Sequence, residues 1–129
     1  MKLIFVFLSF LISVTIQAGT IENIKVYSPS MKRDINVIVV LPSNTAQLSN
    51  TVYILHGYTG NPQRTIDKDI PTLSRHADHQ QTIFVLPDGN FNSWYVNSPI
   101  NPNSQYETFV GSELVQYIDS HYAVKKDRK

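Results

Sequence analysis

The sequence predicts a protein of the α/β class, built on a mixed and mainly parallel sheet. Three observations support this prediction. Apolar, β-branched runs alternate along the chain with amphipathic segments in the order β-β-β-α-β-α. Two of those runs, residues 51–55 and 82–86, are continuously apolar, as in strands buried on both faces of a parallel sheet. The segment 107–122 repeats its apolar residues at helical spacing.

The first two strands are expected to form an antiparallel hairpin. Residues 22–28 alternate polar and apolar side chains, as a half-buried edge strand does, and Pro29 ends the run. Residues 35–41 form a β-branched run that Pro42 stops. The short connection at 31–34 suits a hairpin, so we expect the two strands to pair directly.

The middle of the chain is predicted to alternate strand, helix and strand. The strand 51–55 is followed by a polar segment at 59–68 and then by a helix over 69–80, in whose first turn Pro71 is tolerable. The strand 82–86 comes next. The apolar positions at helical spacing in this helix are Ile70, Leu73 and Ala77.

A long loop and a second helix complete the predicted elements. The loop, residues 90–105, is rich in Asn, Ser and Pro and follows the strand 82–86. The helix over 107–122 is the most regular of the chain. Its expected buried face consists of Val110, Leu114, Tyr117, Ile118 and His121.

Composition limits the classes of function. The 129 residues allow one domain at most, and 42% hydrophobic with 16% charged residues is typical of a globular chain. A net charge of +1 argues against a nucleic-acid partner and against an anionic membrane surface. The chain has no cysteine, which excludes disulfides, thiolate zinc sites, a catalytic cysteine and a lipid anchor on cysteine.

The first 18 residues are predicted to be a signal peptide. Lys2 gives a positive start, residues 3–12 are almost wholly apolar, and Ala18 is a small residue suited to cleavage. The apolar run is shorter than the roughly 20 residues that span a bilayer, so no stable membrane anchor is expected. The alternative is a buried N-terminal strand or helix. We expect a mature chain from Gly19, secreted or periplasmic.

Six short motifs occur in one order, and together they resemble a known family. They are a strand ending in Leu-Pro, Leu-His-Gly-Tyr-Thr-Gly-Asn, Leu-Pro-Asp-Gly, Asn-Ser-Trp-Tyr, Tyr-Glu-Thr-Phe-Val and Tyr-Ile-Asp-Ser-His-Tyr. In this order they resemble the esterase D-type "putative esterase" family, which includes tributyrin, feruloyl and acetylxylan esterases, S-formylglutathione hydrolases and mycolyltransferases. The resemblance covers about residues 22–129 and implies an α/β-hydrolase fold.

The resemblance also implies a serine carboxylic-ester hydrolase that works through an acyl-serine intermediate, without cofactor or metal. In the family a strand and a Gly-x-Ser-x-Gly elbow follow the helix that matches 107–122, and the catalytic acid and base come later. No Gly-x-Ser-x-Gly occurs here, and Ser112 lies inside an amphipathic helix. We therefore expect residues 19–129 to be the N-terminal part of an esterase domain, lacking the triad and inactive alone. The strand 51–55 would then pair with 82–86 on one side only.

The residues expected in the oxyanion hole follow the strand 51–55. A backbone N–H at the strand exit of many α/β-hydrolases points to the tetrahedral oxyanion, and the resemblance assigns this donor to Tyr58, within a loop that Gly57 keeps flexible. The alternative is that Gly57 only permits a tight turn and that Tyr58 only packs the loop. His56 is expected to be structural, because the family's base lies downstream.

Substrate contacts are expected from the loop that follows 82–86. Open α/β sheets bind ligands at the carboxyl ends of their strands, which places Trp94 and Tyr95 as substrate-binding residues, with loop packing as the alternative. Asp88 is placed there too, and we expect it to organise its loop by side-chain-to-backbone bonds. His76 and His79 have a metal-compatible spacing but no third ligand, so no metal is expected.

Two other functions stay open at this stage. One is an acyltransferase on the same fold, and the other is a non-catalytic exported module that binds a glycan through Trp94, Tyr95 and the other aromatic residues of the loop. The expected partner is a small-molecule or polysaccharide-linked ester. The sequence leaves open the acyl group, the alcohol and the oligomeric state.

Overall fold

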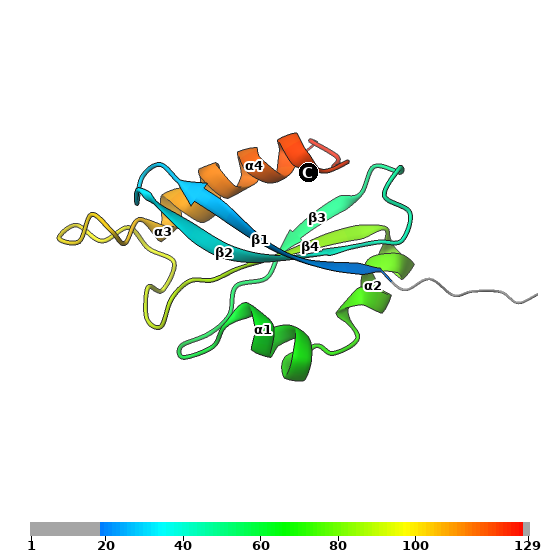
Figure 1. The fold of residues 1–129 in the computed structure, drawn as a ribbon, viewed down its shortest axis with the longest axis horizontal. Helices are drawn as coiled ribbons and strands as arrows, with labels where there is room; N and C mark the ends of the chain where they lie inside the picture. Colours follow the sequence, from blue (N-terminus) through cyan, green and yellow to red (C-terminus); the bar gives the residue numbers. More distant parts are fainter. Residues whose placement is uncertain (1–18, 128–129) are drawn as a thin grey trace, which may run out of the picture.

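The computed structural model describes residues 19–127 as one four-stranded sheet with helices on both faces (Figure 1). The predicted signal peptide, residues 1–18, lies outside the described residues. The strand order in space is β1-β2-β4-β3. The strands are β1 (Thr20–Ser28), β2 (Arg33–Leu41), β3 (Asn50–Tyr53) and β4 (Thr82–Pro87).

The strand pairing confirms the predicted mixed sheet. β1 pairs with β2 in an antiparallel hairpin, as the short connection between them predicts. β2 pairs antiparallel with β4, and β3 pairs parallel with β4. Among the described strands, β3 and β4 are therefore the parallel neighbours, so their carboxyl ends lie side by side.

The two apolar strands differ in burial. β4 is buried at every position, as its continuous apolar run predicts. β3 alternates between exposed and half-buried residues, and Val52 and Leu55 are each 44% exposed. The prediction of burial on both faces was wrong for this strand, because β3 lies at an edge of the described sheet. On its outer side, residues 123–125 pair with Ser49 through a parallel bridge and backbone bonds of 2.9 Å.

The helices form one layer on each face of the sheet (Figure 1). On one face lie α1 (Pro62–Arg64), the π-helical η1 (Thr65–Asp69) and α2 (Leu73–Gln80). On the other lie α3 (Tyr106–Thr108), the π-helical η2 (Phe109–Glu113) and α4 (Leu114–His121). None of these helices has the length and apolarity that a membrane span requires, within the described part of the chain.

The helix predicted over 69–80 begins later, and another helical segment precedes it. Pro71 lacks an N–H and disfavours the α conformation at Ile70, so α2 starts only at Leu73. The predicted polar segment, residues 59–68, is helical from Pro62 onward. Asn61 caps it, since its side-chain oxygen accepts a 2.8 Å hydrogen bond from the Arg64 N–H, and Pro62 suits its first turn.

The second helix is confirmed, but its buried face is shifted. The Leu114 N–H bonds to the Phe109 carbonyl, five residues back, so the helix contains a π-type turn. That wide turn places Phe109 and Leu114 on one face, with Ile118 a further turn along. Val110, expected at the core, is only half-buried, and His121 is exposed, where its Nδ1 hydrogen-bonds the Tyr117 carbonyl at 2.8 Å.

Candidate functional site

The loops that leave β3 and β4 meet at one end of the sheet. Because these strands are parallel neighbours, residues 54–61 and residues 88–105 begin side by side. A cavity of about 100 Å³ lies between the loops. It is lined by His56, Gly57, Tyr58, Gly89 and residues 90–95, so the loops predicted to carry the site are brought together.

His56 joins the two loops through both of its ring nitrogens. Its Nε2 accepts a 2.9 Å hydrogen bond from the Gly89 N–H, and its Nδ1 lies 2.9 Å from the Gly57 carbonyl oxygen. An acceptor at Nε2 and a donor at Nδ1 together define the neutral imidazole with its proton on Nδ1. The side chain is 5% exposed. Since both nitrogens are bound to backbone, His56 is structural, as expected.

Tyr95 ties the ends of β3 and β4 together with its hydroxyl. The hydroxyl accepts a 3.2 Å hydrogen bond from the His56 N–H and donates a 3.3 Å bond to the Pro87 carbonyl. Burial is the main cause that raises the pKa of Tyr95 to about 12, so the hydroxyl stays protonated and able to donate at neutral pH. The Tyr95 ring also meets the His56 ring edge-on, at 5.6 Å between centroids.

Gly89 is required by the close approach of Tyr95. A Cβ atom at Gly89 would overlap the Tyr95 ring and lie 2.6 Å from its hydroxyl oxygen. The ring reaches this position because Trp94 and Tyr95 both adopt left-handed backbone angles, with φ of 52° and 53°. Such angles cost a non-glycine residue roughly 1–2 kcal/mol. The backbone of this loop is therefore strained where it brings Tyr95 next to the cavity.

The Tyr58 N–H lies in a turn that other bonds fix. The Gly60 N–H donates to the Gly57 carbonyl at 3.0 Å, and the Thr59 N–H donates to the Phe91 carbonyl at 3.2 Å. Within residues 19–127 the Tyr58 N–H itself has no hydrogen-bond acceptor. This donor is therefore held in place and left unused, which is the arrangement that an oxyanion hole requires.

Gly57 contributes open space and not an unusual backbone angle. Its φ is not positive, so the turn does not need a glycine for its backbone angle. A Cβ at Gly57 would meet nothing within 4 Å. The absence of a side chain leaves room directly beside the Tyr58 N–H.

Asp88 organises its loop in the way the sequence indicates. Its Oδ1 accepts a 2.9 Å hydrogen bond from the Asn90 N–H, which forms an Asx-type turn directly after β4. The same oxygen lies 3.7 Å from His56 Nε2. Asp88 is half-buried at the edge of the site, and its contact with a substrate stays a prediction.

Three aromatic side chains form an exposed surface beside the cavity. The Tyr58 ring is nearly parallel to Trp94, at 6.0 Å and 9°, and meets Phe91 edge-on at 5.0 Å. Their exposed fractions are 58%, 72% and 55% for Tyr58, Trp94 and Phe91. Phe91 was not singled out from the sequence among the aromatic residues of its loop. The signal available for it was an aromatic residue directly after Pro-Asp-Gly-Asn. Substrate contact by Trp94 stays a prediction.

The other nucleophile and metal candidates lie apart from this site. Ser112 is exposed on η2, and its hydroxyl accepts a hydrogen bond from the Gln116 amide at 3.0 Å. His76 and His79 are exposed on α2. Residues 19–127 contain no group of three His, Cys, Asp or Glu side chains that could hold a metal ion.

Comparison with known families matched residues 28–129 to the family described as "Putative esterase". Comparison with curated protein sequences gave no match. Among solved structures, the chain is similar to an S-formylglutathione hydrolase from Agrobacterium tumefaciens, at 20% identity and a TM-score of 0.76. It is also similar to a ferulic acid esterase from Anaeromyces mucronatus, at 19% identity and a TM-score of 0.61.

These likenesses cover most of this chain and less than half of the other. The chain is covered to 86% in both comparisons, whereas 47% of the Agrobacterium protein and 46% of the Anaeromyces protein are covered. A third similar structure, the Mycobacterium tuberculosis protein MPT51 (FbpC1), has 28% identity and a TM-score of 0.66, with 81% of this chain and 37% of that one covered. At these identities the structural likenesses to the first two show a shared fold.

Proposed function

This chain belongs to the "Putative esterase" family, and from that premise we propose that it forms the oxyanion side of a serine carboxylic-ester hydrolase. The observation that carries the proposal is the Tyr58 N–H. It lies in a fixed turn, without an acceptor among residues 19–127, and beside the empty space at Gly57. When a serine attacks an ester carbonyl, the carbonyl oxygen becomes negative. A preorganised N–H donates to that oxygen.

The surrounding contacts explain why this donor would be effective. A donor that is already fixed needs no reorganisation as the charge develops on the oxygen. Here His56 and Tyr95 supply the rigidity, because together they bond to backbone at Gly57, Gly89 and Pro87. Removing one donor of an oxyanion hole typically lowers the rate about 10²–10³-fold.

In this proposal the catalytic serine, histidine and carboxylate come from residues other than these 129. The sequence has no Gly-x-Ser-x-Gly, both nitrogens of His56 are bound to backbone, and Ser112 has no base beside it among the described residues. The parallel bridge between Ser49 and Val124 supports a further strand beside β3, which is where the family resemblance expects the nucleophile-bearing strand. The 129 residues alone are then expected to lack esterase activity.

The substrate in this proposal is a carboxylic ester met outside the cytoplasm. Residues 1–18 have the order of charge, apolar run and small residue of a signal peptide, which supports export. The ester is a small molecule or is linked to a polysaccharide. N-terminal sequencing of the protein recovered from the periplasm or medium tests export, and a chain that still begins at Met1 would contradict it.

The decisive experiment removes the Tyr58 N–H in the complete protein that carries these residues. Tyr58→Pro deletes the donor, and kcat/KM for p-nitrophenyl acetate is expected to fall about 10²–10³-fold. Tyr58→Phe keeps the N–H and is the matched control, expected to retain activity. Unchanged activity of Tyr58→Pro would show that this N–H does not contribute to catalysis.

A second variant tests the same site without the risk that an introduced proline disrupts the fold. Gly57→Ala places a methyl group in space that no atom of the described chain occupies. Its unfolding midpoint is expected to equal that of the wild type, while kcat/KM falls because the methyl group enters the volume of the reacting ester. Wild-type activity in Gly57→Ala would contradict a substrate position beside Gly57.

A further inference from the structure

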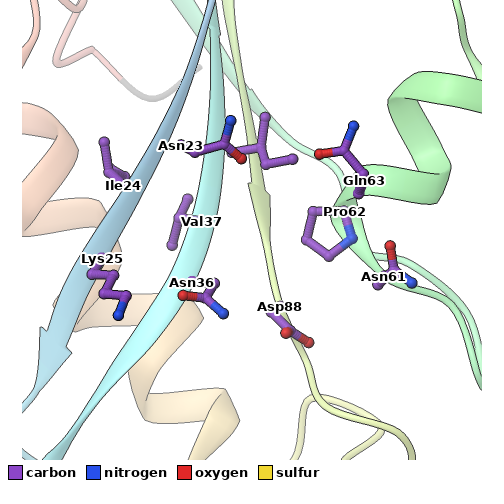
Figure 2. Close-up of a pocket in the computed structure, with 10 residues that line it drawn as sticks. Asn23, Ile24, Lys25, Asn36, Val37, Asn61, Pro62, Gln63 and Asp88 are labelled. Carbon is purple, nitrogen blue, oxygen red and sulfur yellow. The ribbon is translucent and has the colours of Figure 1, made fainter.

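The edge strand β1 is separated from α1 by a cavity on the face of the sheet that carries α1 and α2 (Figure 2). The cavity has a volume of about 340 Å³. Figure 2 shows Asn23 on β1 and Gln63 on α1 at opposite sides of it. The first two residues of the strand are exposed, and Ile21 is the larger of them. On this face, packing therefore does little to hold the start of β1, so the polar contacts of the residue before it become important.

Gly19, the residue directly before β1, is bonded to α2 through its backbone nitrogen. The Gly19 N–H donates a 2.8 Å hydrogen bond to Asp78 Oδ2, and the Ser43 N–H donates a 2.6 Å bond to the other carboxylate oxygen, Oδ1. The two donors lie near one another because Thr20 pairs with Leu41 at this end of the hairpin. The Asp78 carboxylate therefore joins α2 to the start of β1 and to the loop that follows β2.

The packing around Gly19 leaves no room for a side chain. A Cβ atom there would overlap the Leu41 carbonyl oxygen and would lie 3.1 Å from the carbonyl oxygen of Ser74, on α2. Both oxygens belong to the backbone of regular elements, so neither can move away cheaply. Any larger residue at this position would push its nitrogen away from Asp78. The close approach that the glycine permits and the bond to the carboxylate therefore go together.

Asp78 carries a negative charge at a place that favours a cation. The backbone bond from Ser43 is the main cause that lowers the pKa of Asp78, and the neighbouring His79 is the weakest of the causes that lower it, so the carboxyl group is ionised at neutral pH. No ion pair of residues 19–127 includes Asp78. Asp78 also lies in the last turn of α2, where the negative end of the helix dipole disfavours a carboxylate. A positive group beside it would be stabilised by both charges.

Removal of the predicted signal peptide would turn the Gly19 nitrogen into such a group. Hydrolysis of the peptide bond before Gly19 consumes one water, whose oxygen goes to Ala18, which leaves as a carboxylate. The two hydrogens of the water go to the nitrogen, which becomes NH₃⁺. An α-amino group has an ordinary pKa of about 7.7–8.0, so it is mainly protonated at neutral pH. The neutral N–H that donates to Asp78 is thus replaced by a cation at the same place.

We propose that the Asp78 carboxylate is the binding site of the mature amino terminus, and that Gly19 forms an ion pair with it once the signal peptide has been removed. The pair holds the start of β1 on α2 in the exported protein, and it is absent from the precursor, where the nitrogen is an amide. Glycine has no side chain to order, so this pair loses less conformational entropy than one between two long side chains. The proposal rests on the predicted cleavage before Gly19, and it is independent of ester hydrolysis.

The test compares the thermal unfolding of two forms of the complete protein at pH 7. One form begins at Gly19, and the other carries a neutral Ser-Gly-Ser-Gly extension, which turns the Gly19 nitrogen back into an amide. The form that begins at Gly19 is expected to unfold at a midpoint about 1–4 °C higher, a range that allows for the partial exposure of the pair. Asp78→Asn keeps the shape of the side chain and removes its charge. In that variant the midpoints of the two forms should agree within about 0.5 °C, as a double-mutant cycle requires.

Asp34→Asn is the matched control, because Asp34 is exposed in β2 opposite Tyr27, at the other end of the hairpin, and its loss should leave the difference between the two forms intact. Equal midpoints of the two wild-type forms would overturn the proposal. A difference that persists in Asp78→Asn, or one that Asp34→Asn also abolishes, would do the same, as would a first residue other than Gly19 in the exported protein. Unfolding requires no ester, whereas failure of the proposed hydrolase would appear only with p-nitrophenyl acetate, so the two failures are distinguishable.

Discussion

The loop that leaves β3 and the loop that leaves β4 meet at one cavity, but they contribute different groups to it. Residues 54–61 contribute the Tyr58 N–H, the empty space at Gly57 and the His56 ring, which bonds the Gly57 carbonyl and the Gly89 N–H. Residues 88–105 contribute side chains, and Tyr95 ends at the backbone of His56 and Pro87. The loop expected to present the catalytic donor is thus held by the Tyr95 side chain of its neighbour and by its own His56 ring.

The two loops also differ in where strain is stored. In the β4 loop, Asn90, Trp94 and Tyr95 have left-handed φ values of 59°, 52° and 53°, whereas in the β3 loop Thr59 has one of 60°. Backbone strain of this kind persists only where surrounding contacts over-determine it. The hydroxyl bonds of Tyr95 and the close packing against Gly89 are those contacts. The loop of Tyr58 is thus held by a residue that lies 39 positions after His56 in the chain.

The largest expected effect comes from a pair of glycine substitutions, one in each loop. Gly89→Ala places a methyl group into the Tyr95 ring, so the ring must move and its hydroxyl bonds are lost. Overpacking of this kind costs typically about 1–3 kcal/mol. Gly57→Ala meets nothing within 4 Å and should change the free energy of unfolding by less than about 0.5 kcal/mol. Urea unfolding of both variants measures the difference.

Equal stabilities of these two variants would mean that the β4 loop relaxes around the added methyl group, and that Tyr95 is not fixed by its contact with Gly89. Gly89→Ser is a useful second measurement, because its larger side chain should destabilise at least as much as alanine does.

Much of this arrangement could be predicted from the sequence, because it follows from local patterns. The burial of β4, the hairpin of β1 and β2, and the helix up to His121 all follow from apolar spacing and turn residues. The parallel β3–β4 pair then brings the two candidate loops together. Asp88 accepts a hydrogen bond from the Asn90 N–H, as predicted, because an Asp side chain commonly bonds the backbone N–H two residues later.

Other features depend on contacts that no local pattern encodes. The Tyr95 hydroxyl reaches His56 only because two consecutive residues adopt left-handed angles, which neither Trp94 nor Tyr95 favours by type. The π-type turn at Phe109 shifted the buried face of the second helix. The helix start at Pro62 is different, because the Asn-Pro pair is a local cap signal that sequence reasoning overlooked.

The second expected effect is a loss of stability at alkaline pH. The pKa of Tyr95 is about 12 in the folded chain against an ordinary value of 10.0. Between these values the unfolded chain has released this proton and the folded chain has kept it. Stability from this group is therefore fully present below pH 10 and is lost as pH rises through 12. Unfolding followed from pH 9 to 12 should show this decline.

Tyr95→Phe separates this contribution from those of other tyrosines. Burial also raises the pKa values of Tyr106 and Tyr122, so a decline should remain in the variant, but with a shallower slope. The same slope in the variant and the wild type would show that ionisation of Tyr95 does not loosen the β4 loop.

The third effect is the loss of the Tyr95 hydroxyl at neutral pH. Tyr95→Phe keeps the ring but leaves the His56 N–H and the Pro87 carbonyl without this partner, at a cost of about 0.5–1.5 kcal/mol. The matched control is Tyr58→Phe, because its exposed hydroxyl forms no hydrogen bond among residues 19–127. Thermal unfolding should lower the midpoint only for Tyr95→Phe. A shift of equal size in both variants would show that the Tyr95 hydroxyl contributes no more to stability than the exposed Tyr58 hydroxyl.

The smallest expected effect on stability contrasts two neighbouring residues of the β4 loop. Trp94 has almost the same φ as Tyr95, but it is 72% exposed and its ring stacks on the exposed Tyr58 ring. Trp94→Ala should therefore change the free energy of unfolding by less than about 0.5 kcal/mol. In the complete protein it should raise KM for a polysaccharide-linked ester more than KM for p-nitrophenyl acetate, because only the larger substrate extends over the exposed aromatic surface. A destabilisation as large as that of Gly89→Ala would show that Trp94, too, holds the loop. Tyr95 and Trp94 could then no longer be distinguished as a residue that positions the site and a neighbour that faces the substrate.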